Sequence, residues 1–271
     1  MDGLGDRMKE QYEDRYRFML PRRTYTIIRV DGKAFHSYTR KFERPFDDRL
    51  SRAMDRTGIE LCKNIQGAQL GFVQSDEISI VVTDFESIQT DAWFNGNLQK
   101  IVSVAASLAT AHFNVAIRGT QTEQFISSQT IPSSPATFDA RVFTIPDREE
   151  VCNYLIWRQK DASRNSLQAV AQSLYSHNEL HGKNNASLHD LIFRKGINWD
   201  DYAPRNKRGA AIVKNYNIAG CETPGRSEWE TDPATPIFTQ ERDYLGERIP
   251  YPGYEKKQLD ALPSVSGPAV C

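Results

Sequence analysis

Three carboxylates sit at the ends of short, largely apolar runs that have the composition of buried strands. Asp31 follows the run 27–30, and Asp76 and Glu77 lie between the runs 69–74 and 78–83. Carboxylate oxygens are hard ligands, as required by a divalent cation that carries nucleotide phosphates. The sequence therefore predicts a two-metal nucleotidyl-transfer site.

Each of these signals also has a plain structural explanation. An Asp-Gly pair after a strand, or a Ser-Asp-Glu sequence at a hairpin tip, is usually a solvated turn. The metal-site interpretation rests on finding both, each beside an apolar strand, in the order that a βαββαβ sheet would bring together. Two metals held about 4 Å apart by such carboxylates would activate an attacking hydroxyl and neutralise a leaving pyrophosphate.

Composition narrows the possible classes of protein. The 271 residues are 39% hydrophobic and 25% charged, which suits one large core or a core with a small appendage. The net charge of −1 argues against a globally basic nucleic-acid binder, so RNA would have to contact local patches. No membrane span or signal peptide is expected, and we predict a cytoplasmic protein. The four widely spaced cysteines suggest neither a zinc site nor a disulfide framework.

The hydrophobic pattern predicts how these residues are positioned. We expect a strand at 25–30, a helix from Pro45 to before Gly67, a hairpin, and a long helix over 94–115. A further strand is expected at Phe138–Ile145. This order predicts an α+β fold, a polymerase-palm or ferredoxin-like βαββαβ catalytic sheet with its helices packed on one face.

The flanking regions are less distinctive. We expect a short surface helix within 7–23 that ends at Pro21, helices at 147–176 (in two pieces) and 188–195, and a strand at 209–215. The chain after Gly220 is polar and rich in proline. Residues 1–219 are therefore predicted to form a palm-like catalytic and tRNA-binding domain, followed by an extended or partly disordered C-terminal segment at 220–271.

Five motifs together resemble the tRNAHis guanylyltransferase superfamily, the reverse (3′-to-5′) polymerases. They are 29–36 (RVDGKAFH), 44–47 (RPFD), 74–79 (QSDEIS), 138–141 (FDAR) and 157–161 (WRQKD). The resemblance implies a palm-like catalytic domain, two Mg²⁺ ions and a homotetramer. It also implies a reaction in which ATP or GTP activates a tRNA 5′-monophosphate, which the 3′-hydroxyl of an incoming NTP then attacks.

One departure indicates a branch within this superfamily. Members dedicated to tRNAHis carry a His-Ile-Asn-Asn-Leu-Tyr-Asn run after the Trp-Arg-Gln motif, whereas residues 163–168 here are SRNSLQ. The sequence thus resembles the Thg1-like-protein branch of bacteria and archaea, whose members repair the 5′ ends of truncated tRNAs by Watson-Crick templating. Segments 176–183, 192–199 and 207–209 also look like that branch. Addition of an extra 5′ G to tRNAHis remains the alternative.

The resemblance assigns roles around the nucleotide. Asp31 and Asp76 would bind the metals together with the carbonyl of Gly32, and Glu77 would be a third catalytic carboxylate of less defined role. Backbone amides would surround the triphosphate. These belong to Lys33, Ala34, Phe35 and His36.

For the other polar residues in the motifs, a substrate-binding role and a structural role both remain open. Ser75 either bonds a phosphate or closes the turn, and His36 either contacts a phosphate or lies at the edge of the core. Arg44 and Asp47 would bind nucleotide at a helix start, or be a solvated arginine and a helix-terminal charge. Arg141 and Arg158 would bind the activating nucleotide or the tRNA 5′-phosphate, or form structural ion pairs.

Two basic stretches with interleaved aromatic residues are candidates for tRNA binding, although runs of charge are commonly solvated surface. The residues assigned to tRNA are Arg22, Arg23, Lys183, Arg194, Lys195, Lys207 and Arg208.

Two other classes of protein fit parts of the pattern. Nucleotide cyclases carry paired carboxylates on the same fold and need no RNA. A catalytically inactive RNA-binding module is disfavoured by the presence of Asp31, Asp76 and Glu77.

Overall fold

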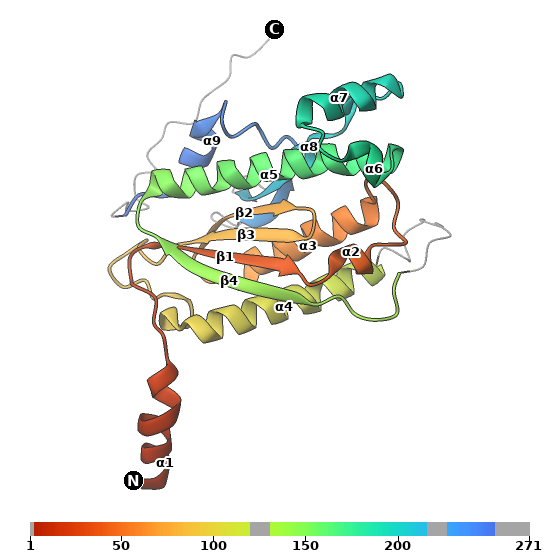
Figure 1. Ribbon diagram of the computed structural model, residues 1–271. Coiled ribbons are helices and arrows are strands. Elements are labelled where there is room, and N and C mark those ends of the chain that lie inside the picture. Colours follow the sequence, from red (N-terminus) through yellow and green to blue (C-terminus); the bar gives the residue numbers. More distant parts are fainter. Residues whose placement is uncertain (1–2, 120–130, 216–226, 253–271) are drawn as a thin grey trace.

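A six-stranded antiparallel sheet forms the centre of the computed structural model, which describes residues 3–119, 131–215 and 227–252 (Figure 1). The sheet order is β4-β1-β3-β2-β5-β6, and its first four strands have the βαββαβ arrangement predicted from the sequence. The α+β prediction is confirmed. The strands are β1 (Tyr25–Gly32), β2 (Ala68–Gln74), β3 (Glu77–Val82), β4 (Phe138–Ile145), β5 (Ala210–Asn215) and β6 (Glu228–Asp232).

Helices cover both faces of this sheet (Figure 1). The longer helices are α3 (Asp48–Asn64), α4 (Leu98–Gly119), α5 (Arg148–Leu174) and α7 (Asn185–Arg194). The shorter ones are α1 (Gly3–Met8), η1 (Lys9–Glu13), η2 (Asp14–Tyr16), α2 (Phe35–Tyr38), η3 (Trp93–Gly96), α6 (His177–Leu180), η4 (Trp199–Asp201), α8 (Pro204–Arg208) and α9 (Arg242–Gly246).

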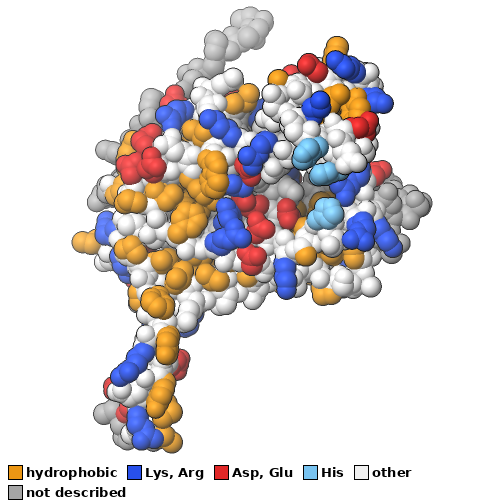
Figure 2. Space-filling view, in the orientation of Figure 1, with side chains coloured by type: hydrophobic (Ala, Val, Ile, Leu, Met, Phe, Trp, Pro, Cys, Tyr) orange, Lys and Arg blue, Asp and Glu red, His pale blue; other side chains and the backbone are white. Residues whose placement is uncertain are grey.

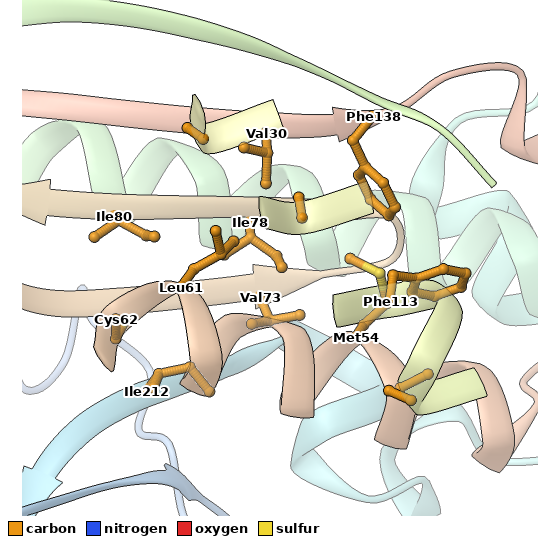
Figure 3. Packing of buried hydrophobic residues seen from close by; sticks show 14 of the residues in the cluster. Val30, Met54, Leu61, Cys62, Val73, Ile78, Ile80, Phe113, Phe138 and Ile212 are labelled. Carbon is orange, nitrogen blue, oxygen red and sulfur yellow. The ribbon is translucent and has the colours of Figure 1, made fainter. Parts of the chain in front are cut away.

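The two crossover helices, α3 and α4, pack on the same face of the sheet, as predicted. Val30 and Ile78 of the sheet meet Met54 and Leu61 of α3 and Phe113 of α4 in one buried cluster (Figure 3). Each of these side chains is 0% exposed, so this cluster is a main source of hydrophobic stabilisation. It also fixes the strand β1 whose end carries Asp31.

Helix α4 is, within the described residues, the one helix long and apolar enough to cross a membrane by length and composition. No such run was predicted from the sequence. In the structure, Ile101, Ala105, Ala109 and Phe113 of α4 are buried in the cluster beneath the sheet. The apolar residues of α4 thus pack in the hydrophobic core.

Helix α5 lies on the opposite face of the sheet. The sequence had predicted helices on one face only. It is one continuous helix of 27 residues rather than two pieces, and its Asp147 side chain accepts a hydrogen bond from the N–H of Glu150 at the N-terminus. Val151 and Leu155 pack there with Ile27 and Phe72 of the sheet. The apolar side chains of the sheet that face α5 are therefore enclosed, whereas Asp31 on the same side is partly exposed.

Residues 227–252 are packed, in contrast to the extended segment expected at 220–271. Strand β6 pairs with β5, and Phe238, Leu245 and Ile249 are each 0% exposed in the cluster under α5. The expectation of an extended tail is thus wrong for 227–252. Residues 220–226 and 253–271 lie outside the described residues.

The N-terminal helical segment stands away from the body of the molecule (Figure 1). Its elements α1, η1 and η2 contain no buried residue, and the segment ends at Tyr16 rather than at Pro21. Leu4, Met8 and Tyr12 on it are exposed. It takes no part in positioning the carboxylates.

Candidate active site

Four polar residues, three of them acidic, form a row across the sheet on the face covered by α5, and we call it the acidic row. Asp31 of β1 is paired with Asp139 of β4 on one side and with Glu77 of β3 on the other, and Glu77 is paired with Gln74 of β2. Because residues paired across antiparallel strands share a face, their side chains are neighbours. The strand ends thus bring together residues that are far apart in the sequence.

The hairpin turn holds Asp76 beside this row. The N–H of Gly32 donates to the carbonyl of Asp76 at 3.0 Å, which ties the end of β1 to the turn between β2 and β3. Ser75 has a positive φ of 46°, so the turn reverses within two residues. Asp31, Asp76 and Glu77, the three predicted catalytic carboxylates, are therefore close together.

Their electrostatics reflect this crowding. Burial, followed by repulsion from Glu77 and Asp139, raises the pKa of Asp31 above its ordinary value. Burial raises the pKa of Asp76 to about 6, a hydrogen bond from Ser75 opposes this, and repulsion from Asp31 and Glu77 adds to it. Carboxylates that repel each other in a buried place are stabilised by a bound cation.

Glu77 differs from the two aspartates because a buried arginine neutralises it. Arg158 Nε and Nη2 of α5 donate to Glu77 Oε1 and Oε2 at 2.8 and 2.7 Å, and Arg158 Nη2 also donates to Asp161 Oδ2 at 2.9 Å. Arg158 is 6% exposed. Its guanidinium is thus a partner of Glu77, in line with the ion-pair alternative rather than with a contact to a nucleotide or the tRNA 5′-phosphate.

The donor set of the two aspartates fits a divalent cation. Among the described residues, no Lys, Arg or His side chain lies within ion-pair distance of Asp31 or Asp76. The described residues also contain no group of three or more His, Cys, Asp and Glu side chains arranged for a metal. The protein ligands would then be two carboxylates and backbone oxygen, a hard set that suits Mg²⁺.

Gly32 has a packing role in addition to its predicted metal-binding carbonyl. A Cβ at this position would lie 2.2 Å from Cδ2 of Phe35. The Phe35 ring is buried and packs against Phe113 and Phe138. The glycine therefore makes room for the aromatic residue that anchors the turn after β1.

The turn after β1 keeps part of the predicted phosphate cradle. Ala34 adopts a left-handed conformation with φ 55°, and α2 begins at Phe35. The N–H of Lys33 donates to the carbonyl of Thr137 at 2.9 Å, so this amide is already used. The amides of Ala34, Phe35 and His36 remain the predicted donors, and the side chain of His36 is exposed.

Asp47 is a structural residue in this arrangement. Its carboxylate accepts from the N–H of Arg49 at 2.9 Å and of Glu43 at 3.0 Å, and it forms an ion pair with the Arg49 side chain at 2.7 Å. Burial raises its pKa, but these hydrogen bonds outweigh burial and lower it overall. Asp47 thus caps α3, in line with the helix-terminal alternative rather than with direct nucleotide binding. Arg44 is exposed.

A pocket of about 210 Å³ adjoins the hairpin turn, and we call it the hairpin pocket. It lies between the 42–47 loop, the turn at Ser75, the 162–169 part of α5, and α8. Its walls are partly apolar, with polar groups among them, which is usual for ligand sites. Its lining includes Phe42, Arg44, Gln74, Ser75, Ser166 and Arg205.

A row of basic side chains runs beside the acidic row. Arg29 of β1 is paired with Arg141 of β4 and with Ser79 of β3. Arg141 is exposed, and Arg29 Nε lies 3.9 Å from Glu77 Oε2. Arg141 thus keeps its predicted availability for a phosphate next to the carboxylates. Figure 2 shows this face, where carboxylate side chains gather near the middle and are bordered by Lys, Arg and His.

The predicted tRNA-binding residues do not form one surface. Arg22 Nε binds Asp84 at 2.5 Å near the start of β1, and Arg23 beside it is exposed. Arg194 and Lys195 are exposed at the end of α7, and Lys183 lines a separate pocket of about 180 Å³.

Lys207 and Arg208 are held by the protein itself. Lys207 Nζ donates to the carbonyl of Asp200 at 2.5 Å and lies over the Trp199 ring, and its side chain is 14% exposed. Arg208 Nε donates to the carbonyl of Thr235 at 2.9 Å. Both side chains line a pocket of about 460 Å³, and their predicted role in tRNA binding stays a prediction.

Sequence reasoning missed two residues of the acidic row. Asp139 lies within the 138–141 motif, where only Arg141 was assigned, and its alternation with Phe138 could have placed it on the polar face. Gln74 was quoted in a motif without a role. Gln74 pairs with Glu77 because Ser75 and Asp76 alone form the turn between the two strands. A two-residue turn at these positions fixes the hairpin register and could have predicted the pair.

Comparisons with known proteins agree with this geometry. Residues 5–146 match the family model for tRNAHis guanylyltransferase, Thg1. An uncharacterized protein of Acanthamoeba polyphaga mimivirus is 34% identical over 226 residues, which is 78% of this chain and 77% of that protein. A structure described as a bacterial tRNAHis guanylyltransferase (Thg1)-like protein in complex with ATP is 42% identical, has a TM-score of 0.79, and covers 91% of this chain and 99% of that one.

A second structure bears the same description in complex with GTP. It is 41% identical, has a TM-score of 0.76, and covers 91% of this chain and 98% of the other. The resemblance inferred from the five motifs is confirmed. The chain belongs to the tRNAHis guanylyltransferase (Thg1) family and is a nucleotidyltransferase of that family.

Proposed function

We propose that this nucleotidyltransferase is a template-dependent 3′-to-5′ polymerase that repairs the 5′ ends of truncated tRNAs. The observation that carries the proposal is the pair Asp31 and Asp76 at the hairpin turn, beside a pocket that opens at Ser75. A site for phosphate chemistry would then lie next to a site of the size of a nucleobase. The SRNSLQ sequence at 163–168 favours repair over the dedicated tRNAHis reaction.

In this proposal the nucleotide lies along the turn after β1. The amides of Ala34, Phe35 and His36 would surround its phosphates, and exposed Arg44 would add a bidentate donor. Ser75 lines the hairpin pocket and directly precedes Asp76. It would therefore lie between the phosphate site and the base site. Asp31, Asp76 and the Gly32 carbonyl would hold two Mg²⁺ ions, which neutralise phosphate charge when bound.

The reaction would take place in two transfers. First, an oxygen of the tRNA 5′-monophosphate attacks the α-phosphorus of ATP or GTP, forming a new P–O–P bond and releasing pyrophosphate. Then the 3′-hydroxyl of the incoming NTP attacks the 5′-phosphorus of the tRNA, the nucleoside monophosphate leaves, and the hydroxyl proton is lost to solvent. Arg141, exposed beside Asp139, would bind the 5′-phosphate.

The SRNSLQ segment at 163–168, which differs from the tRNAHis-dedicated members, would contact the substrates. Asn165 and Ser166 line the hairpin pocket, whereas Ser163, Arg164 and Leu167 line the larger pocket on the other side of α5. Replacing this run therefore changes surfaces on both sides of one helix. The tRNA would contact exposed Arg23, Arg194 and Lys195. A homotetramer and a cytoplasmic location belong to the same proposal.

Incubation with labelled NTP tests the class of reaction. With α-labelled ATP and a 5′-monophosphorylated truncated tRNA, we expect label to appear first on the RNA 5′ end as an adenylylated intermediate. ATP alone should remain unchanged. A labelled cyclic nucleotide formed without RNA would support a cyclase instead, and absence of any product would indicate an inactive RNA-binding module.

A further inference from the structure

The pocket on the far side of α5 carries an excess of positive charge, and we call it the Trp199 pocket. It has a volume of about 460 Å³ and lies between α5, α7, α8 and the chain after β6. The residues of fixed charge that line it are Lys160, Arg164, Lys207, Arg208 and Asp200. Because four cations face one carboxylate, the pocket suits a ligand with several negative charges.

Two of these cations are available to such a ligand. Lys160 is exposed, and its side chain makes no ion pair or hydrogen bond with the described residues. Arg208 uses Nε for the carbonyl of Thr235, and its two terminal nitrogens have no partner among those residues. The other two cations are paired with neighbouring aspartates. Phosphate groups can therefore bind here without breaking an existing contact.

Aromatic rings form a flat wall in the same pocket. Trp199 Nε1 donates to Ser166 Oγ at 3.0 Å, which fixes the indole ring. The ring of exposed His189 meets it edge-on, with centroids 5.5 Å apart and an interplanar angle of 87°. Bases of single-stranded nucleic acids stack on aromatic side chains, including His, while basic residues follow the phosphates. The Trp199 pocket combines both features.

The Trp199 pocket and the hairpin pocket lie on opposite sides of the same two helices. In α5, Asn165 lines the hairpin pocket and Ser163 the Trp199 pocket, and in α8 the same holds for Arg205 and Lys207. An α-helix with its side chains is about 10–12 Å across, so the pockets are separated by roughly that distance. A tail of four nucleotides spans roughly 14 Å when stacked at about 3.4 Å per nucleotide, which is enough to pass from one pocket to the other.

We propose that the Trp199 pocket binds the single-stranded 3′ end of the tRNA whose 5′ end lies at the carboxylates. The inference rests on the proposed function for the presence of tRNA, and it adds which part of the RNA contacts the far side of α5. The 3′ strand of a tRNA continues unpaired beyond the 5′ end, so its tail begins close to the place of transfer. A base stacked on His189, with phosphates at Lys160 and Arg208, would hold the strand that supplies the template.

Equilibrium binding of two RNAs to the full chain tests this assignment. Both are the same 5′-monophosphorylated truncated tRNA, and one lacks the unpaired 3′ tail. Wild type should bind the RNA with the tail about tenfold more tightly, the size of one stacked base. In His189→Ala this ratio should fall to near one. In Lys160→Gln the salt slope of log K for the tailed RNA should decrease by about 0.7, the value for one phosphate of a single strand.

Each variant has a matched control. Lys100→Gln changes an exposed lysine of α4 on the opposite face of the sheet, and His177→Ala changes an exposed histidine that lines the separate pocket of about 180 Å³. Both should keep the wild-type ratio and salt slope. Changes in the controls as large as those in the two variants would overturn the inference.

A crosslink locates the tail independently of any variant. With 4-thiouridine as the 3′-terminal nucleotide, irradiation of the wild-type complex should join the RNA to segment 185–208. Equal binding of the two RNAs by wild type, or crosslinks confined to other segments, would overturn the inference whether or not the variants fold. A tail that strengthens binding without any transfer to the RNA 5′ end would instead overturn only the proposed function.

Discussion

Arg158 and Glu77 form a two-point ion pair across the space between α5 and β3, with N–O distances of 2.8 and 2.7 Å. The Trp157 ring lies 4.4 Å from the Arg158 guanidinium. Glu77 is 7% exposed, so its charge is separated from water. This pair keeps one carboxylate of the acidic row neutralised and leaves Asp31 and Asp76 for a cation.

Removal of Arg158 should destabilise the protein strongly. Arg158→Leu leaves the Glu77 charge buried without its partner, which costs about 3–5 kcal/mol of unfolding free energy. Urea unfolding measures the change. Arg164→Leu is the control, because Arg164 also contacts Asp161 but its side chain is 56% exposed. If both variants were destabilised by the same small amount, the Arg158–Glu77 pair would not be a buried, interdependent unit.

Asp76 should make stability depend on pH when no metal is bound. Its pKa is raised from the ordinary value of 3.8 to about 6 in the folded state, so folding favours the protonated form. The resulting stabilisation is fully present below about pH 4 and is lost as the pH rises through about 6. At pH 7 in a chelator the loss amounts to roughly 2–3 kcal/mol.

The Asp76→Asn variant should not lose this stability as the pH rises. In a chelator, chemical unfolding at about pH 4 and pH 7 should show a smaller decrease for the variant than for wild type. Mg²⁺ should stabilise wild type at pH 7 and leave the variant almost unchanged. An identical pH dependence in both proteins would contradict the electrostatic account of Asp76.

Gly32→Ala should disturb packing behind the site. The new Cβ would meet the Phe35 ring at 2.2 Å, and overpacking of this kind costs about 1–3 kcal/mol. Thermal unfolding checks the loss, and Phe35→Leu in the same chain should restore part of it. Gly3→Ala serves as the control, since no atom lies within 4 Å of a Cβ there. A Gly32→Ala protein as stable as the control would refute this packing role.

Charge reversal at exposed cations should weaken tRNA binding. Arg194→Glu and Lys195→Glu should each raise KM for tRNA and reduce the salt slope of log K by roughly one for each phosphate that the variant no longer binds, with KM for NTP nearly unchanged. Lys100→Glu on α4 is an exposed control on the opposite face of the sheet. Lys207→Glu should instead lower stability, because Lys207 is bonded to Asp200. A tRNA salt slope that neither variant alters would mean that α7 does not contact tRNA.

The sequence was informative wherever a local pattern decides the structure. The β-branched run before Asp31 and the short turn at Ser75 and Asp76 predicted the strand, the hairpin and the adjacency of the carboxylates. Side-chain partners were harder to predict. Nothing local indicates that Arg158 reaches Glu77, 81 residues away, because that contact depends on how α5 crosses the sheet.

The C-terminal region shows the same limit. Its polar, proline-rich composition indicated an extended chain, yet β6 finds its partner in β5, and single apolar residues such as Phe238 fill the space under α5. A few well-placed apolar side chains suffice for packing when the surface that receives them is already formed. Such a surface is a property of the tertiary structure and leaves no periodic signal in the segment itself.

Template swapping tests the central claim most directly. Two 5′-monophosphorylated tRNAs, each lacking the first nucleotide, would differ only in the base opposite the missing position, and all four NTPs would be offered in competition. Sequencing of the 5′ ends should show that each tRNA gains the nucleotide complementary to its own template base, and that Asp31→Asn adds none. Addition of G whatever the template, or addition only to tRNAHis opposite A, would contradict the account.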